Sequence, residues 1–195
     1  MKKSFLLLFS LILTILLAAG CNAAPDAATA EPETPPPAAE PESPEAPKSD
    51  VASAGQMAPV EDVVDPGMVP VYADALQDGV YSITVDSSSS MFNITACELT
   101  VAEGTMTAVM HMGGTGYLYV FPGTGEEAAQ AEESALISYA EDGDGAHTFT
   151  LPVEALDAGL DCAAYSKKKE MWYDRTLVFR ADSLPLEAFR EGVFT

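Results

Sequence analysis

The sequence predicts an all-β domain, a sandwich or barrel of about eight short strands with one short surface helix, behind a disordered tether. Three observations lead to this fold class. Apolar and polar residues alternate with period two along much of 66–195, and glycine-rich turn signals separate these runs. The stretch before them consists of Ala, Pro and Glu without any apolar periodicity.

The charge balance excludes whole classes of partner. The 195 residues include 30 Asp and Glu against 9 Lys and Arg, which gives a formal net charge of −21. Nucleic acid is excluded as a direct partner, because binding its phosphates requires a basic face. Electrostatic attraction to an anionic lipid surface is disfavoured for the same reason.

The N-terminus has the form of an export signal. A basic start, Met1-Lys2-Lys3, precedes an apolar run over 5–17, and small residues follow it. The end of this segment, Ala18-Ala19-Gly20-Cys21, resembles the lipobox of bacterial lipoproteins, with Ala18 at the place where Leu is usual.

This resemblance implies that 1–20 is a lipoprotein signal peptide. Cys21 would then be the first residue of the mature chain, acylated with fatty chains such as palmitate. Two acyl chains hold a protein stably on a membrane, so we expect a lipid anchor on the extracytoplasmic face of the cell membrane. The alternative is a secreted protein that is cleaved nearby and keeps a free Cys21.

The stretch 21–65 predicts a disordered tether. It is rich in Pro, Ala and Glu, and this composition cannot bury enough apolar surface to offset the entropy of the chain. We expect it to act as a spacer that lifts the following domain off the membrane.

The remaining stretch, 66–195, is long enough for one hydrophobic core. A capping box, with Thr124 as N-cap and Glu127 at the third position, predicts a helix that continues through 128–133 on the outside of the domain. The expected strands are Val80–Val85, Phe92–Ile94, Leu99–Val101, Met106–Met112, Tyr117–Phe121, Phe149–Val153, Cys162–Tyr165 and Tyr173–Phe179.

Basic residues are confined to the end of the domain. Between Ser49 and Ser166 there is neither Lys nor Arg. A small basic area on an acidic body focuses the electrostatic field, so it is the natural place for an anionic ligand group. The basic residues of the domain are Lys167, Lys168, Lys169, Arg175, Arg180 and Arg190.

Three segments carry a resemblance to a known family. Asp78-Gly79-Val80-Tyr81 opens the domain, a serine run ends in Ser90-Met91-Phe92, and an apolar stretch covers 172–179. In this order they resemble the NEAT domain, the immunoglobulin-like haem-binding module of Gram-positive surface proteins. The resemblance implies an immunoglobulin-like β-sandwich that holds haem between the serine lip and the last hairpin.

In that family a Tyr ligates the iron four residues before a second Tyr on the last strand. If Tyr173 matches the second Tyr, Lys169 stands at the ligand position. The resemblance implies that Ser90, Met91 and Phe92 form the other wall. The Ser-Met-Phe and Lys-Lys-Lys-x-x-Trp-Tyr-Asp-Arg signatures also resemble surface lipoprotein domains of the clostridial type.

The segment 166–175 is the leading candidate for a ligand lip. Lys167, Lys168, Lys169 and Arg175 could pair with carboxylates or phosphates, while Trp172 or Tyr173 stacks on an apolar body. The alternative is a plain hairpin turn with solvated lysines. In that case Trp172 lies in the core, and Arg175 pairs with Asp174 or another carboxylate.

Other polar or sulfur-bearing residues have two interpretations each. Cys97 and Cys162 form a disulfide between sheets or remain two buried thiols. Met110-His111-Met112 suggests copper, although methionine as core filler is the commoner explanation. Asp142-Gly143-Asp144-Gly145 suggests calcium, but a polar hairpin turn explains it better.

No arrangement of residues predicts catalysis, since neither His111 nor His147 lies in a recognisable nucleophile motif. We therefore expect a non-enzymatic ligand-binding module for haem or another anionic iron compound, with a surface protein or an ABC-type uptake system as partner. The alternative is a structural or protein-interaction domain without a small ligand. A deep apolar slot between the two lips would favour the first, and a closed sandwich the second.

Overall fold

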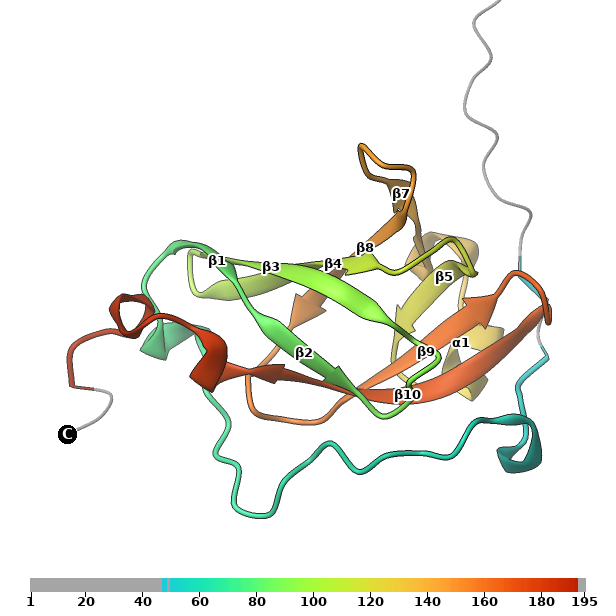
Figure 1. Cartoon of the computed structure of the whole chain (residues 1–195), viewed down its shortest axis with the longest axis horizontal. Helices are drawn as coiled ribbons and strands as arrows, with labels where there is room; N and C mark the ends of the chain where they lie inside the picture. The colour runs from blue at the N-terminus through green and yellow to red at the C-terminus, as the bar shows by residue number, and fades with distance from the viewer. Residues whose placement is uncertain (1–46, 49, 193–195) are drawn as a thin grey trace, which may run out of the picture. The chain divides into compact units, whose positions relative to one another are not determined.

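The computed structural model describes residues 47–48 and 50–192, and the fold is that of this part of the chain (Figure 1). The expected signal peptide 1–20, the acylated Cys21 and the tether up to residue 46 lie outside the described residues. Among the residues that are described, no helix has both the length and the apolar character needed to cross a membrane.

Two antiparallel five-stranded sheets form a β-sandwich, which confirms the predicted fold class. The first sheet has the order β1 (Gly79–Ser82), β3 (Ile94–Ala102), β4 (Thr105–Met112), β8 (His147–Val153) and β7 (Ala140–Glu141). The second has the order β2 (Thr84–Ser87), β10 (Met171–Arg180), β9 (Leu160–Ser166), β5 (Tyr117–Pro122) and β6 (Ile137–Ser138).

The core lies between these sheets and follows the alternation seen in the sequence. Along β4 every second residue is buried, so Met106, Ala108, Met110 and Met112 all face the core. Side chains from the second sheet, such as Leu177 and Phe179 on β10, belong to the same buried cluster. Burial of this continuous apolar layer is the main stabilising term of the domain.

The first predicted strand, Val80–Val85, proves to be two strands in different sheets. Its first half is β1, which pairs with β3, and its second half is β2, which pairs with β10. The break falls at Ile83, which is buried and donates its backbone N–H to the Cys97 carbonyl at 3.0 Å. Period-two patterning cannot reveal this break, because the inward-facing set continues across it.

The predicted helix is present as α1 (Gly125–Gln130), although it ends before the expected residue 133. The Thr124 hydroxyl accepts from the Glu127 N–H at 3.3 Å, and the Glu127 carboxylate accepts from the Thr124 N–H at 2.8 Å. The bonds from Thr124 lower the pKa of Glu127. Ala128 fixes α1 to the outer face of the second sheet, against Tyr165 and Trp172.

Cys97 and Cys162 are free, buried thiols, one on β3 and one on β9. This is the second of the two interpretations that the sequence leaves open. Burial raises the pKa of each thiol to about 12. Both groups are therefore protonated near neutral pH and act as small apolar side chains.

The segment 50–65 departs from the predicted tether, because it packs on the domain. Val51 pairs in parallel with Trp172 of β10, and the Ala52 N–H donates to the Trp172 carbonyl at 2.8 Å. Farther along, Val63 is buried and its carbonyl accepts from Arg180 at 3.3 Å. The ordered domain therefore begins before the expected boundary at residue 66.

We expect a chain shortened to 66–195 to lose about 3 kcal/mol of its free energy of unfolding relative to 22–195, because buried Ala52 and Val63 and their backbone hydrogen bonds are removed. Urea denaturation measures this difference. A chain that begins at Pro47 is the matched control, since it keeps these contacts. Equal stability of the chains that begin at 47 and at 66 would show that 50–65 adds nothing to the fold.

Candidate functional site

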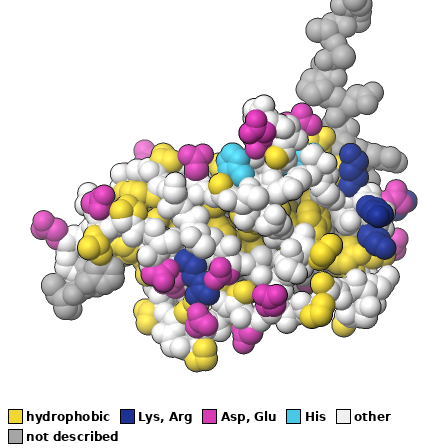
Figure 2. Space-filling view, in the orientation of Figure 1, with side chains coloured by type: hydrophobic (Ala, Val, Ile, Leu, Met, Phe, Trp, Pro, Cys, Tyr) yellow, Lys and Arg dark blue, Asp and Glu magenta, His cyan; other side chains and the backbone are white. Residues whose placement is uncertain are grey.

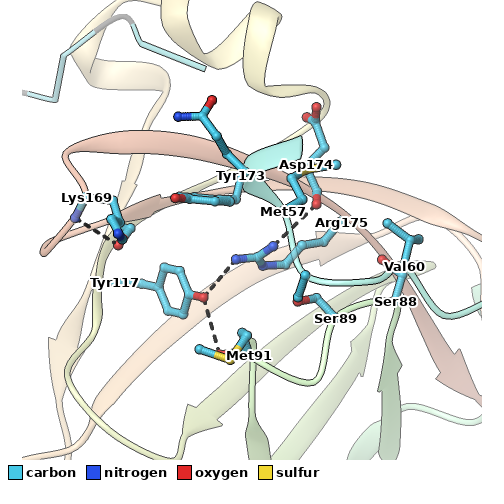
Figure 3. Close-up of a pocket in the computed structure, with 13 residues that line it drawn as sticks. Met57, Val60, Ser88, Ser89, Met91, Tyr117, Lys169, Tyr173, Asp174 and Arg175 are labelled. Atoms are coloured by element: carbon cyan, nitrogen blue, oxygen red, sulfur yellow. Dashed lines mark hydrogen bonds between the residues drawn. The ribbon is translucent and has the colours of Figure 1, made fainter. Parts of the chain in front are cut away.

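A cavity of about 300 Å³ opens at one end of the inter-sheet core (Figure 3). Four segments enclose it: residues 56–60, the serine turn 88–91, the start of β5, and the β9–β10 hairpin. The residues that line it are Gln56, Met57, Ala58, Val60, Ser88, Ser89, Met91, Tyr117, Ser166, Lys169, Tyr173, Asp174 and Arg175. The serine lip and the hairpin singled out in the sequence therefore do meet at a cavity.

Alternation along β10 decides which of its side chains reach this cavity. Tyr173 and Arg175 lie on the inner face, in line with the core residues Leu177 and Phe179. Trp172 lies on the opposite face, fully buried, with its ring centroid 5.2 Å from that of Tyr165 under α1. The prediction that Trp172 contacts the ligand is corrected accordingly, because its side chain points away from the cavity.

Arg175 is the central polar group of the site. Its side chain is buried, with a relative exposure of 6% for the residue. One terminal nitrogen donates to the Tyr117 hydroxyl at 2.8 Å, and the other donates to the Asp174 carbonyl at 3.3 Å. The guanidinium carbon lies 5.1 Å from the ring centroids of Phe92 and Tyr117 and 5.7 Å from that of Tyr173. Aromatic faces thus hold this cation in place.

Arg175 has no ionic partner in the described part of the chain. None of the ion pairs there includes it, and its Nε donor has no hydrogen-bond partner. The expected pairing with the Asp174 carboxylate does not occur, since that group turns to the outer face and accepts from the Gly125 N–H at 2.5 Å. A buried charge without a counter-charge lowers the stability of the fold, so the presence of Arg175 here points to a role other than stability.

The serine turn lines the cavity with Met91, which the sequence named as a site residue, and with Ser88 and Ser89, which it did not. Ser88 and Ser89 are buried and line the cavity, whereas Ser90 is exposed and does not. Ser88 is held by Thr176, whose N–H donates to the Ser88 hydroxyl at 2.9 Å. Met91 lines the cavity and is 68% exposed, which places it at the rim.

Phe92 lies beneath the cavity and does not line it. It is a core residue, and it packs edge to face on Tyr117 with ring centroids 5.2 Å apart. Its place in the sequence-predicted lip is therefore corrected to that of a floor residue under Tyr117 and Arg175. This position follows from burial, because Phe92 is only 1% exposed.

The three lysines form the turn of the β9–β10 hairpin. Only Lys169 lines the cavity, and its backbone N–H donates to the Ser166 hydroxyl at 3.3 Å. Lys167 and Lys168 are exposed beside it. Basic side chains gather at this tip of the molecule in Figure 2, where Lys48 also pairs with Glu170. The lysine turn thus places positive charge at the edge of the cavity, and Lys169 alone of the three lines its wall.

Sequence reasoning missed Tyr117 and the segment 56–60. Tyr117 reaches Arg175 because the register between β5 and β9 shifts between residues 117 and 119. The sequence did contain a signal for the segment 56–60. Residues 22–50 contain no apolar side chain larger than Ala or Pro, whereas Val51, Met57 and Val60 mark 51–64 as a segment able to pack.

The two motifs that suggested a metal in the sequence have structural roles instead. Met110 and Met112 are buried in the core, and His111 points the other way, with its Nδ1 3.4 Å from an oxygen of Asp142. Asp142 caps its own turn, since it accepts from the Ala146 and Asp144 N–H groups, which lower its pKa. Within residues 50–192, no cluster of three or more His, Cys, Asp or Glu could hold a metal ion.

We expect Arg175→Met to raise the free energy of unfolding of the ligand-free protein by about 1 kcal/mol, because it replaces a buried, unpaired cation with an apolar side chain of similar length. Arg180→Met is the matched control. Arg180 pairs with Asp65 and Asp86, so its loss should destabilise by about 2 kcal/mol. Urea unfolding compares the two, and a clear loss of stability in Arg175→Met would make Arg175 a structural residue.

Two solved structures show a distant similarity to this chain. No protein-family model matches the chain, and no curated protein matches it. The NEAT5 domain of IsdX2, a B. anthracis hemophore in complex with haem, is a similar solved structure: it has 15% identity, covers 53% of this chain and 96% of its own, and gives a TM-score of 0.38. A mutant of that domain, also with haem, has 16% identity, the same coverage and the same TM-score.

Proposed function

We propose that this protein is a lipid-anchored, extracytoplasmic ligand-binding module whose cavity takes an organic anion with an apolar body. The observation that carries the proposal is the buried Arg175, which lines the cavity without an internal counter-ion. A protein with 30 acidic residues could easily supply a carboxylate to this cation. No carboxylate among the described residues forms an ion pair with Arg175, which favours a ligand that brings the negative charge.

The walls of the cavity suit an apolar ligand body. Tyr173 and Tyr117 present aromatic surface, and Met57, Val60 and Met91 present aliphatic or thioether surface. Apolar lining with a few placed polar groups is the usual composition of small-molecule sites. The lysine turn at the entrance would guide an anion toward a cavity on an otherwise acidic protein.

Haem, or another anionic iron compound, is one candidate for the ligand of this cavity. Tyr173, Tyr117 and Met91 would flank the porphyrin and include oxygen and sulfur donors for iron, and Lys169 would meet a propionate. The site agrees with haem only in part. A fixed guanidinium beside the same rings repels ferric iron, and the phenol of Tyr117 is already bonded to Arg175 and to the Met91 carbonyl.

The alternative, a structural or protein-interaction domain, has less support. A closed and fully packed sandwich would favour it, but this sandwich is open at the end where the serine turn meets the hairpin.

Membrane attachment is tested by changing the residue that would carry the lipid. We expect the natural chain to partition with membranes and to incorporate radiolabelled palmitate, and Cys21→Ala to lose both, because the thioether and the new N-terminus both need Cys21. Fractionation and autoradiography measure this. The Cys162→Ala variant is the control for thiol chemistry elsewhere, and unchanged labelling of Cys21→Ala would remove the anchor from the proposal.

Haem binding is tested by titrating haemin into the unlipidated chain 22–195 and recording the visible spectrum. If haem is the ligand, a saturable shift of the Soret band appears. The affinity for haemin then falls by about tenfold in Tyr173→Phe, because the phenol oxygen that could ligate iron is lost. Tyr72→Phe is the matched control, since Tyr72 is exposed and lines no part of this cavity. A featureless, non-saturating response retires haem and leaves the binding of other anions to be measured.

A further inference from the structure

The guanidinium of Arg175 is held in position with donors to spare. An arginine has five N–H donors, and only two partners, the Tyr117 hydroxyl and the Asp174 carbonyl, are present in the described structure. Both partners are neutral oxygens, so they orient the group without neutralising its charge. The Nε donor is buried and has no hydrogen-bond partner in the described structure. A guanidinium can meet a carboxylate with two parallel hydrogen bonds.

Three carboxylates of this part of the domain have other partners. Asp174 bonds to the backbone of α1, and Asp86 and Asp65 both pair with Arg180. Asp161 lines an adjoining cavity with Arg175, and it forms no ion pair with Arg175 in the described structure. The guanidinium of Arg175 is therefore held in a fixed position among aromatic rings and is preorganised to bind the anionic group of a ligand.

We propose that the cavity recognises a small monocarboxylate, inserted with its carboxylate inward on Arg175 and its apolar body between Tyr173, Tyr117 and Met57. This inference rests on the proposed ligand-binding function and names the class and orientation of the ligand. One guanidinium matches one carboxylate in charge. Ser88 adds a second polar contact: its hydroxyl oxygen accepts from Thr176, so its proton is free to be donated to the ligand.

The size of the cavity limits the body of this ligand. At about 300 Å³ it stands at the lower end of the range for ligand pockets, which suits a single ring or a short aliphatic chain. A phosphate monoester fits less well, since Arg175 alone does not balance its second negative charge, and Lys169 is on the hairpin turn. The lysines are on the hairpin turn, and only Lys169 touches the cavity wall.

Calorimetric titration of the unlipidated chain 22–195 tests the proposal with three pairs of probes. The carboxylates are benzoate, phenylacetate and octanoate, and their neutral counterparts are benzamide, phenylacetamide and octanamide. We expect at least one carboxylate to bind saturably and its amide to bind at least about tenfold more weakly, because the amide cannot form the charged bidentate pair. Phenyl phosphate, the anion of the other class, should bind more weakly than the best carboxylate.

Three variants locate the binding. Arg175→Met should weaken the best carboxylate at least about tenfold, and Arg175→Lys should be intermediate, because it keeps the charge but loses the planar fork. Arg190→Gln is the matched control for the loss of one positive charge, since Arg190 is exposed and lines no part of this cavity, and we expect a change below about threefold. Circular dichroism and urea unfolding of each variant show that a loss of binding is not a loss of fold.

The outcomes separate this inference from the proposed function. Saturable haemin binding that is unchanged in Arg175→Met, with no carboxylate binding, overturns the inference and leaves the module standing. Carboxylate binding that does not depend on Arg175, or tighter binding of phenyl phosphate, also overturns it. If neither haemin nor any carboxylate binds, both proposals fall.

Discussion

The placement of a single strand, β10, determines most of what is distinctive in this domain. Its ten residues are long enough to leave the core at one end, so the same face that presents Leu177 and Phe179 to the interior presents Arg175 and Tyr173 to the cavity. Its other face carries Trp172 to the cluster under α1. Because the strand pairs with β2, β9 and the segment around Val51, none of these positions can shift alone.

The fold was predictable from the sequence because its strands obey one simple rule. Alternation identified the inward face of β4 through Met106 and Met110, and the capping box identified α1 through Thr124 and Glu127. The split at Ile83 was not predictable, since one residue crosses between sheets without disturbing the pattern. The boundary of the domain was misplaced because composition averages over a stretch whose last part contains packing residues such as Val51 and Val63.

The site was predictable only in outline. The sequence pointed to the serine run and the hairpin, and these do meet, but which residues face the cavity depends on register and on backbone geometry. Trp172 and Phe92 are as conspicuous in the sequence as Tyr173, yet they serve buried clusters. Tyr117, which orients Arg175, is brought there by an irregularity in β5 that no short-range signal announces. The residues that surround Arg175 can be identified only when the pairing of strands distant in the sequence is known.

The opposite charges of Asp174 and Arg175, on opposite faces of the same strand, also bear on folding fidelity. A slip of β10 by one residue would carry the carboxylate against the rings of Phe92 and Tyr117 and would leave the guanidinium facing the N–H of Gly125. Each group would then meet the wrong electrostatic environment, while Trp172 would exchange its apolar cluster under α1 for the cavity-facing position of Tyr173. A pair of adjacent residues thus penalises misregistered pairing of the longest strand, and would do so in the nascent chain before any ligand is present.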